Sequence, residues 1–222
     1  MTPIHLLLVD DHPLVREGLR AVLDVEPDMQ IVAEASNGRE AVQLAQQHHP
    51  DVIIMDILMP SQDGAAATAD ILRHNPDARV LILSSLMDPE RILPAVQAGA
   101  LGYVAKNTPP DNLITAIRIL HQGGVHLPAA LARRLLRANG ANPTTPSLDD
   151  LTGRELEILK LVAQGLGNEA IAAQLVISSR TAGVHVSHIL DKLGLENRTQ
   201  AALYALRRGL VSLDDSSEIN FF

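Results

Sequence analysis

Cysteine is absent from the 222 residues, which excludes disulfide bonds, thiolate metal sites and a cysteine nucleophile. No apolar run approaches the roughly 20 residues that a membrane-spanning helix needs. The N-terminal segment has no basic stretch before its short apolar run, so we expect no signal peptide. Apolar residues make up 46% and charged residues 20%, which excludes disordered and fibrous classes. We therefore expect a cytoplasmic globular protein with one large or two small domains and no membrane partner.

Basic residues are scarce, and the charge is unevenly distributed. The formal net charge of the chain is −8. Residues 1–124 carry a net −8, residues 125–147 carry +3 from three arginines, and residues 148–212 are neutral. A nucleic-acid-binding domain usually shows a basic patch. Here the only basic segment lies in the middle of the chain.

Apolar runs alternate with helical patterns in the first 124 residues. Strands separated by helices of this length indicate βαβ units around a parallel sheet. Several of the runs are continuously apolar, as expected for strands covered on both faces. We predict an α/β fold with a doubly wound five-stranded parallel sheet, its strands being Ile4–Val9, Ile31–Val32, Val52–Met55, Val80–Leu83 and Gly102–Val104.

The pattern changes after residue 124. Pro128–Ala138 can form a linker helix with Leu131 and Leu135 on one face, and residues 139–147 are rich in turn residues typical of a flexible joint. Only helical patterns follow, over Glu155–Gln164, Glu169–Leu175, Ser179–Leu193 and Thr199–Arg208. The predicted organisation is an α/β domain over 1–124, a linker with a helix over 125–147, a smaller all-α four-helix domain over 148–212, and an acidic tail over 213–222.

Polar residues stand at the ends of the predicted strands. Asp10 and Asp11 follow the first strand and Asp56 ends the third, while Ser84 ends the fourth and Lys106 follows the fifth. In an open parallel sheet these ends meet at one edge, where ligands bind. Three adjacent carboxylates stay ionised only beside a compensating cation, and oxygen ligands suit Mg²⁺. The cluster therefore predicts a site for a phosphoryl group, with Asp56 as the carboxylate nucleophile. For a single aspartate, capping of a helix is an equally good explanation.

Four segments resemble the receiver domain of two-component response regulators: VDDHP (9–13), DILMPSQDG (56–64), SS (84–85) and GYVAK (102–106). The fold of the chemotaxis receiver CheY, with strand order 2-1-3-4-5, follows by analogy. The resemblance implies that a sensor histidine kinase phosphorylates Asp56. It also implies a set of residues with separate roles. Mg²⁺ is held by Asp11, Asp56 and the backbone carbonyl of Leu58, with Asp10 acting through water, and the phosphoryl oxygens are bound by Ser84 and Lys106.

Tyr103 is, by the same resemblance, the aromatic side chain that turns inward when Ser84 moves. The alternative is a half-buried aromatic residue on a strand. A different class of protein, a Mg²⁺-dependent phosphohydrolase with an aspartate nucleophile, commonly needs a second aspartate two residues further on. Leu58 occupies that position and cannot donate a proton. We therefore predict a phosphoacceptor with at most slow autodephosphorylation, not an enzyme.

Residues 151–202, which begin LTGRELEILKLVAQGL, resemble the four-helix DNA-binding domain of NarL/FixJ-type regulators, also called LuxR-type. Residues 171–175, a turn at 176–178 and a helix from Ser179 form a helix-turn-helix, with Ser178 or Ser179 as the N-cap. The opposite face of the second helix lies in the major groove in such motifs. The buried stripe of this helix is predicted to be Ala182, Val186, Ile189 and Leu193.

The recognition helix departs from the family pattern, which usually has lysine at the positions of Gly183 and Ser187. Each lost phosphate contact lowers DNA affinity and flattens its salt dependence. The residues that we expect to contact DNA are Arg180, Thr181, Val184, Ser187, His188 and Lys192.

We expect a response regulator whose phosphorylation controls transcription. In the resting state the receiver is expected to cover the recognition helix, and phosphorylation then favours a homodimer on two half-sites of double-stranded DNA. The two-state element would comprise Ser84, Tyr103 and the helix that contains Pro94. That proline is expected to delay the start of its helix or to kink it. The alternative is a phospho-switched protein-interaction regulator with a degenerate DNA-binding helix.

Overall fold

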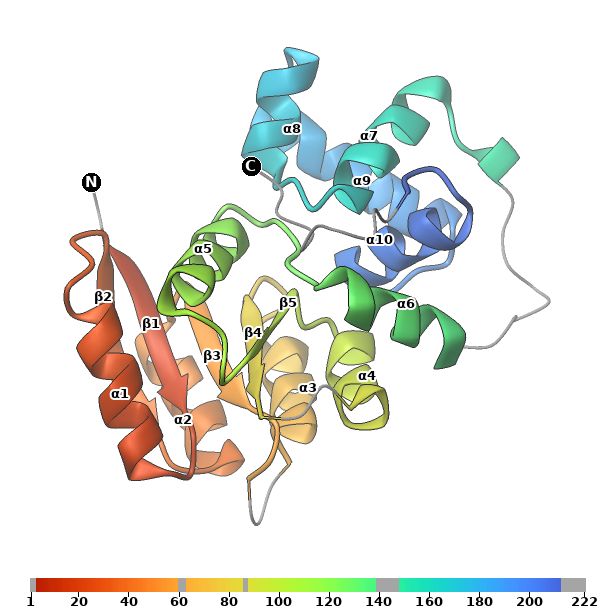
Figure 1. Ribbon diagram of the computed structural model, residues 1–222. Helices are drawn as coiled ribbons and strands as arrows, with labels where there is room; N and C mark the ends of the chain where they lie inside the picture. Colours follow the sequence, from red (N-terminus) through yellow and green to blue (C-terminus); the bar gives the residue numbers. More distant parts are fainter. Residues whose placement is uncertain (1–2, 60–62, 86–87, 139–147, 213–222) are drawn as a thin grey trace.

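The computed structural model describes residues 3–59, 63–85, 88–138 and 148–212. The chain folds into an α/β domain and a smaller helical domain that lies against one end of it (Figure 1). Within the described ranges, no helix is long and apolar enough to cross a membrane. The predicted joint at 139–147 and the acidic tail at 213–222 lie outside the described residues.

A five-stranded parallel sheet forms the centre of the first domain. Its order, β2-β1-β3-β4-β5, confirms the predicted topology, and every neighbouring pair is parallel. The second strand is longer than predicted because it lies at the edge of the sheet, where polar residues interrupt the apolar run. The strands are β1 (Ile4–Val9), β2 (Met29–Ala35), β3 (Val52–Asp56), β4 (Val80–Ser84) and β5 (Gly102–Ala105).

Five helices cover the two faces of the sheet. They are α1 (Pro13–Leu23), α2 (Gly38–His48), α3 (Gly64–His74), α4 (Pro89–Ala98) and α5 (Pro110–His121). Successive strand residues point to opposite faces, so β1 sends Leu7 to one core and Leu6 to the other. The first core contains residues of α2, α3 and α4, and the second contains residues of α1 and α5. Helices on both faces of a parallel sheet confirm the predicted doubly wound architecture.

Helix α4 begins earlier than the sequence suggested. Asp88 caps it by accepting a hydrogen bond from the backbone N–H of Glu90 at 3.1 Å, and the helix then runs through Pro94 to Ala98. The expectation of a late start is therefore wrong. Pro94 has no N–H to donate to the carbonyl one turn earlier. The side chain of Pro94 is exposed to solvent. Water can therefore donate a hydrogen bond to the carbonyl group that lacks this partner.

The segment after α5 extends the first domain instead of leaving it. His126 accepts a hydrogen bond from Tyr103 N at 2.8 Å and donates its own N–H to Leu101 O at 2.9 Å, so it pairs with β5. Helix α6 (Ala129–Ala138) confirms the predicted linker helix. Its Leu131 and Leu135 are fully buried in the core that α4 shares.

Four helices form the second domain, as predicted. A short 3-10 turn (Leu148–Asp150) precedes α7 (Gly153–Ala163), α8 (Asn168–Leu175), α9 (Ser179–Lys192) and α10 (Arg198–Arg207). Ser178 caps α9 by accepting a hydrogen bond from Thr181 N at 3.0 Å. The four predicted stripe residues of α9 are buried in the domain core, which confirms the helix-turn-helix packing: Ala182, Val186, Ile189 and Leu193.

The two domains touch through α10 and the turn between α7 and α8. The buried Thr199 donates its hydroxyl to Ala100 O at 2.8 Å, and Asn197 Nδ2 donates to Gln97 O at 2.9 Å. The backbones approach so closely that a Cβ atom on Gly167 would lie 1.9 Å from the carbonyl oxygen of Gln122. Glycine is therefore required at this contact.

Helix α9 lies outside this contact. Its residues Arg180, Ser187 and His188 are exposed, and Val184 is 47% exposed. The expectation that the receiver covers the recognition helix is therefore wrong in this conformation. The first domain instead covers the start of α10, where the Thr199 hydroxyl and the Asn197 amide donate hydrogen bonds to backbone carbonyl groups near the end of α4.

Candidate functional site

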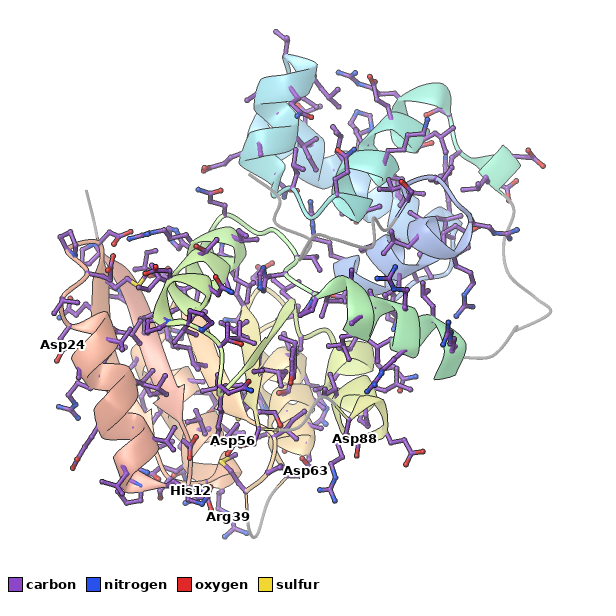
Figure 2. The ribbon with its side chains drawn as sticks, viewed as in Figure 1. His12, Asp24, Arg39, Asp56, Asp63 and Asp88 are labelled. Carbon is purple, nitrogen blue, oxygen red and sulfur yellow. The ribbon has the colours of Figure 1, made fainter. Side chains whose placement is uncertain are left out.

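Three charged side chains meet at the carboxyl edge of the sheet. The Nζ atom of Lys106 lies 2.6 Å from Asp10 Oδ2 and 2.7 Å from Asp56 Oδ2. Asp10 and Asp56 are almost completely buried, at 0% and 1% exposure. Figure 2 shows Asp56 and His12 near this edge of the sheet, with Asp63 at the start of the next helix. The predicted convergence of the strand ends is therefore present.

Local backbone hydrogen bonds aim the two carboxylates into the cluster. Asp56 Oδ1 accepts a bond from Leu58 N at 3.0 Å, and Asp10 Oδ1 accepts one from His12 N at 2.9 Å. Each is a side chain bonding to the backbone two residues later, a turn that Asp favours. Because β3 runs beside both β1 and β4, these turns start from adjacent strands of the sheet.

Ser84 and Lys106 are positioned by the pairing of β4 with β5. Lys106 N donates to Ser84 O at 2.9 Å, one step beyond the pair Ser84 and Ala105. Ser84 is 1% exposed, so its hydroxyl lies inside the domain at the end of β4. The lysine and the serine therefore flank the same edge as the aspartates.

The electrostatics of the cluster favour an added cation. Burial raises the pKa of Asp56, although the ammonium group of Lys106 works in the opposite direction. Burial works against the charge of Lys106 as well, but hydrogen bonds to Asp10 and Asp56 leave its pKa above the ordinary value. The ammonium group of Lys106 thus pairs with two buried carboxylates, those of Asp10 and Asp56.

The donor set fits a divalent metal ion. Ligand atoms of Asp10, Asp11, His12 and Asp56 lie within 4.8 Å of one another. Carboxylate oxygens are the ligands that Mg²⁺ takes in proteins. The receiver family implies such an ion, and these residues could hold it.

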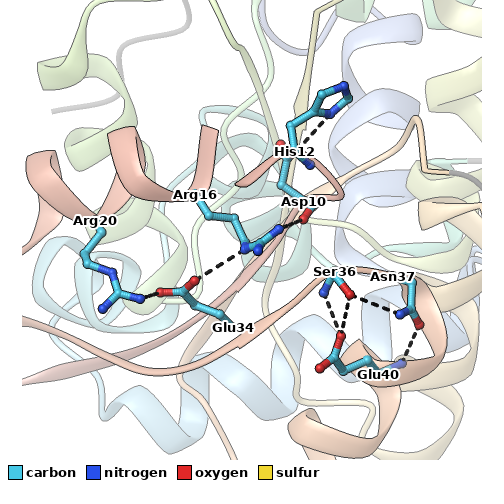
Figure 3. Close-up of polar contacts among 8 residues, drawn as sticks. All are labelled: Asp10, His12, Arg16, Arg20, Glu34, Ser36, Asn37 and Glu40. Carbon is cyan, nitrogen blue, oxygen red and sulfur yellow. Dashed lines mark hydrogen bonds and ion pairs between the residues drawn. The ribbon is translucent and has the colours of Figure 1, made fainter. Parts of the chain in front are cut away.

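Two residues of this region were missed by sequence reasoning (Figure 3). His12 places Nδ1 2.8 Å from Asp11 Oδ1 and 3.3 Å from Asp10 Oδ1. Arg16 donates to the backbone carbonyl of Asp10 at 2.6 Å and pairs with Glu34 on β2 at 3.3 Å. Arg16 therefore ties the turn after β1 to the neighbouring strand. The position of His12 directly after two aspartates was the available signal.

Tyr103 on β5 is fully buried, so the alternative of a half-buried aromatic residue is wrong. Burial raises the pKa of its hydroxyl. Within the described part of the chain, that hydroxyl has no hydrogen-bond partner. The ring is thus inside the domain in this conformation, while its part in a switch remains a prediction.

The recognition helix presents a mixed face to solvent. Arg180, Thr181 and His188 are exposed polar residues, and Ser187 lies among them. Gly183 is partly buried, and a Cβ atom there would lie 3.3 Å from Asn168 Nδ2. The face therefore offers two side chains able to carry positive charge, one of them a histidine.

Lys192 was predicted to contact DNA, but its ammonium group lies 2.7 Å from Glu155 Oε2 at the start of α7. This bond, together with bonds from Thr152, lowers the pKa of the buried Glu155 to about 2. Glu155 also forms a capping box with Thr152. A signal for the position of Glu155 was present in the sequence, because threonine followed three residues later by glutamate is typical of a capping box. Lys192 therefore anchors α9 to α7.

Comparison with known families assigns both parts of the chain. Residues 6–118 match the family described as "Response regulator receiver domain". Residues 149–205 match the family described as "Bacterial regulatory proteins, luxR family". The two matches occur in the order that the sequence motifs predicted.

Relatives cover nearly the whole chain. The transcriptional regulatory protein LiaR of Bacillus subtilis is 41% identical over 94% of this chain and 100% of its own length. The oxygen regulatory protein NreC of Staphylococcus carnosus is 37% identical over 93% of this chain and 98% of its own. Among solved structures, the response regulator ChrA of a heme-sensing two-component system is 38% identical, with a TM-score of 0.52 over 95% of this chain and 100% of its own. The response regulator RcsB bound to DNA is 25% identical, with a TM-score of 0.55 over 93% of this chain and 99% of its own.

The chain belongs to the NarL/FixJ family of two-component response regulators, with a receiver domain followed by a LuxR-type DNA-binding domain.

Proposed function

We propose that Asp56 accepts a phosphoryl group from a sensor histidine kinase, in a pocket where Asp10, Asp11, Asp56 and the backbone carbonyl of Leu58 hold Mg²⁺. The observation that carries the proposal is the contact of Lys106 with two buried carboxylates, at 2.6 Å and 2.7 Å. Two buried negative charges beside one positive charge favour a second cation. Such a chain acts in the cytoplasm, where it meets both the kinase and DNA.

In the transfer, a carboxylate oxygen of Asp56 forms a bond to phosphorus while the bond from phosphorus to the kinase histidine breaks. The histidine nitrogen keeps the electron pair of that bond. When bound, Mg²⁺ offsets the negative charge that the phosphoryl group brings into the pocket. Lys106 and the hydroxyl of Ser84 donate hydrogen bonds to the phosphoryl oxygens. Leu58 supplies no proton for a leaving group, so we expect the phosphoaspartate to hydrolyse slowly.

Helix α4 can connect the phosphorylation pocket to the second domain. It begins after Ser84, at the carboxyl edge of the sheet, and ends at Gly99 on the opposite edge, about 15 Å away. There the carbonyl groups of Gln97 and Ala100 accept the hydrogen bonds from α10. A displacement of α4 on phosphorylation therefore changes the contact that holds the DNA-binding domain.

We propose that the exposed face of α9 contacts double-stranded DNA as part of a homodimer on two half-sites. The DNA complex of the relative RcsB supports this role. The proposed contact residues are Arg180, Thr181, Val184, Ser187 and His188. We assign Lys192 to the ion pair with Glu155 instead. A lysine held in that pair adds little to phosphate binding.

The phosphorylation site is tested with Asp56→Asn and the matched control Asp63→Asn. Asp63 is an exposed N-cap of α3, and asparagine caps helices equally well. Each full-length variant is incubated with acetyl phosphate and Mg²⁺, and its intact mass is measured. The unchanged chain and the control are expected to gain one phosphoryl group, while Asp56→Asn gains none. Labelling of Asp56→Asn at the unchanged rate would refute the assignment.

A phospho-switched protein-interaction regulator is the second candidate. It is favoured by the absence of lysine at Gly183 and Ser187 and by the neutral charge of residues 148–212. Selection from a pool of random duplexes, repeated at increasing salt, separates the two functions. Enrichment of a motif with two half-sites supports DNA binding, whereas absence of binding down to low salt supports the protein-interaction role.

A further inference from the structure

The imidazole of His12 lies at the mouth of the acidic cluster without belonging to the ligands that the family implies. Its Nδ1 atom is 2.8 Å from Asp11 Oδ1 and 3.3 Å from Asp10 Oδ1. The side chain is 64% exposed, whereas that of Asp10 is fully buried. His12 therefore approaches the carboxylates from the solvent side of the pocket.

These separations suit atoms that share one metal ion. Adjacent ligands about 2.1 Å from an octahedral cation lie about 3.0 Å from each other. The distances from His12 Nδ1 to the two aspartates lie on either side of that value. The backbone fixes this arrangement, because His12 N donates to Asp10 Oδ1 at 2.9 Å immediately before α1 begins.

We propose that His12 Nδ1 is a metal ligand of the receiver pocket and makes this site prefer a first-row transition-metal dication, such as Mn²⁺ or Co²⁺, over Mg²⁺. The inference rests on the metal site proposed above. Mg²⁺ takes oxygen ligands and retains its waters, so an imidazole adds little to its binding. Transition-metal dications bind imidazole nitrogen well and increasingly so along the series from Mn²⁺ to Cu²⁺. His12 is thus a residue that determines metal specificity.

Binding through Nδ1 requires the neutral imidazole to carry its proton on Nε2. If the proton starts on Nδ1, it leaves to solvent as the metal binds and Nε2 takes up another from solvent, so the imidazole remains neutral. The exposure of the side chain allows this exchange.

Electron paramagnetic resonance of Mn²⁺ bound to the full-length chain tests the proposal directly. Spin-echo modulation detects a coordinated ¹⁴N nucleus, and chain labelled with ¹⁵N-histidine shows whether that nucleus belongs to a histidine. The test variant is His12→Asn, which removes the ring nitrogen and suits the N-cap position. The matched control is His49→Asn, an exposed histidine that ends α2 in a left-handed conformation that asparagine tolerates.

We expect a histidine nitrogen signal in the unchanged chain and in His49→Asn, and none in His12→Asn. Calorimetric titration of His12→Asn is expected to show about tenfold weaker Mn²⁺ binding with Mg²⁺ binding within about twofold of the unchanged chain. Bound Mn²⁺ with no nitrogen signal in the unchanged chain would overturn the role of His12 while leaving the metal site intact. Mn²⁺ binding that Asp11→Asn and Asp56→Asn leave unchanged would instead refute the proposed metal site. The labelled unchanged chain decides the question even if His12→Asn fails to fold.

Discussion

The pocket around Asp56 and the exposed face of α9 differ in how far contacts within the chain orient their side chains. In the pocket, Lys106 contacts Asp10 and Asp56, so the functional groups are oriented by one another. On α9, the side chains of Arg180 and His188 are exposed to solvent. The geometry of an internal site is thus set by contacts among its own residues, whereas an exposed face is defined only by its exposure and charge.

The ion pairs of two lysines, Lys106 in the pocket and Lys192 on α9, differ in the same way. Lys106 is 16% exposed and pairs with two buried carboxylates, while Lys192 is 38% exposed and pairs with one, that of Glu155. A buried carboxylate that loses its partner is costly. Loss of Lys106 affects two such groups, whereas loss of Lys192 affects one, Glu155, which keeps its hydrogen bonds with Thr152. Removal of Lys106 should therefore be the more damaging change.

The largest expected effect is that of Lys106→Met. This change leaves Asp10 and Asp56 buried together without the ammonium group, so we expect the free energy of unfolding to fall by about 3 kcal/mol at neutral pH. Urea titration measures the loss, and Lys160→Met, at an exposed position of α7, is the control. Addition of Asp56→Asn to Lys106→Met is expected to restore part of the stability. Equal free energies of unfolding for Lys106→Met and Lys160→Met would show that the two buried carboxylates do not depend on Lys106.

His126 gives the next largest effect, as a dependence of stability on pH. Burial lowers the pKa of this histidine to about 4, against an ordinary 6.5. Between these values the unfolded chain binds a proton that the folded chain does not, so stability present above pH 6.5 is lost as the pH falls toward 4. We expect a loss of about 2 kcal/mol over this window that His126→Leu does not show. Parallel urea titrations at pH 4.5 and 7.5 compare the two chains; identical pH dependence would contradict the prediction.

Ser187→Lys is expected to strengthen DNA binding by about tenfold and to steepen its dependence on salt by about one counterion. The new lysine adds a positive charge at this exposed position of α9. The control Gln47→Lys adds the same charge on α2, in the receiver domain. Fluorescence anisotropy on a selected duplex at several salt concentrations measures both quantities. Equal gains from the two variants would mean that α9 does not face DNA.

Tyr103→Phe is expected to give the smallest change, a gain in stability of up to about 1 kcal/mol. It removes a buried hydroxyl for which the described residues offer no partner, while keeping the ring that fills the core. Tyr204→Phe, in the second domain, keeps the ring that lies 5.3 Å from the Arg208 guanidinium and is expected to bring no such gain. Thermal unfolding compares the variants. A loss of stability in Tyr103→Phe would show that the hydroxyl has a partner.

Much of the pocket could be predicted from sequence because one rule places it. Apolar runs mark the strands, and parallel strands bring their carboxyl ends to one edge, so Asp10, Asp56 and Lys106 had to converge. The contribution of Arg16 could not be predicted, because it depends on the course of the turn after β1. The domain contact was equally hidden, since Thr199 meets Ala100 through a backbone carbonyl that no side-chain pattern reveals.

For the recognition helix α9, the sequence predicted the local structure but not the contact that Lys192 makes. Its buried stripe followed from helical spacing, and its cap followed from a serine before the first turn. The pairing of Lys192 with Glu155 did not follow from the spacing within α9, because it joins α9 to the start of α7. A charge on a helix surface can face DNA or a neighbouring helix, and only the tertiary arrangement distinguishes the two.

The most direct test of the central claim is DNA binding by the full-length chain before and after phosphorylation. Anisotropy is measured on a selected duplex with and without acetyl phosphate and Mg²⁺, for the unchanged chain and for Asp56→Asn. We predict that phosphorylation raises the affinity of the unchanged chain and leaves that of Asp56→Asn unaltered. An equal response of both chains, or no specific binding by either, would contradict the claim that Asp56 controls a DNA-binding domain.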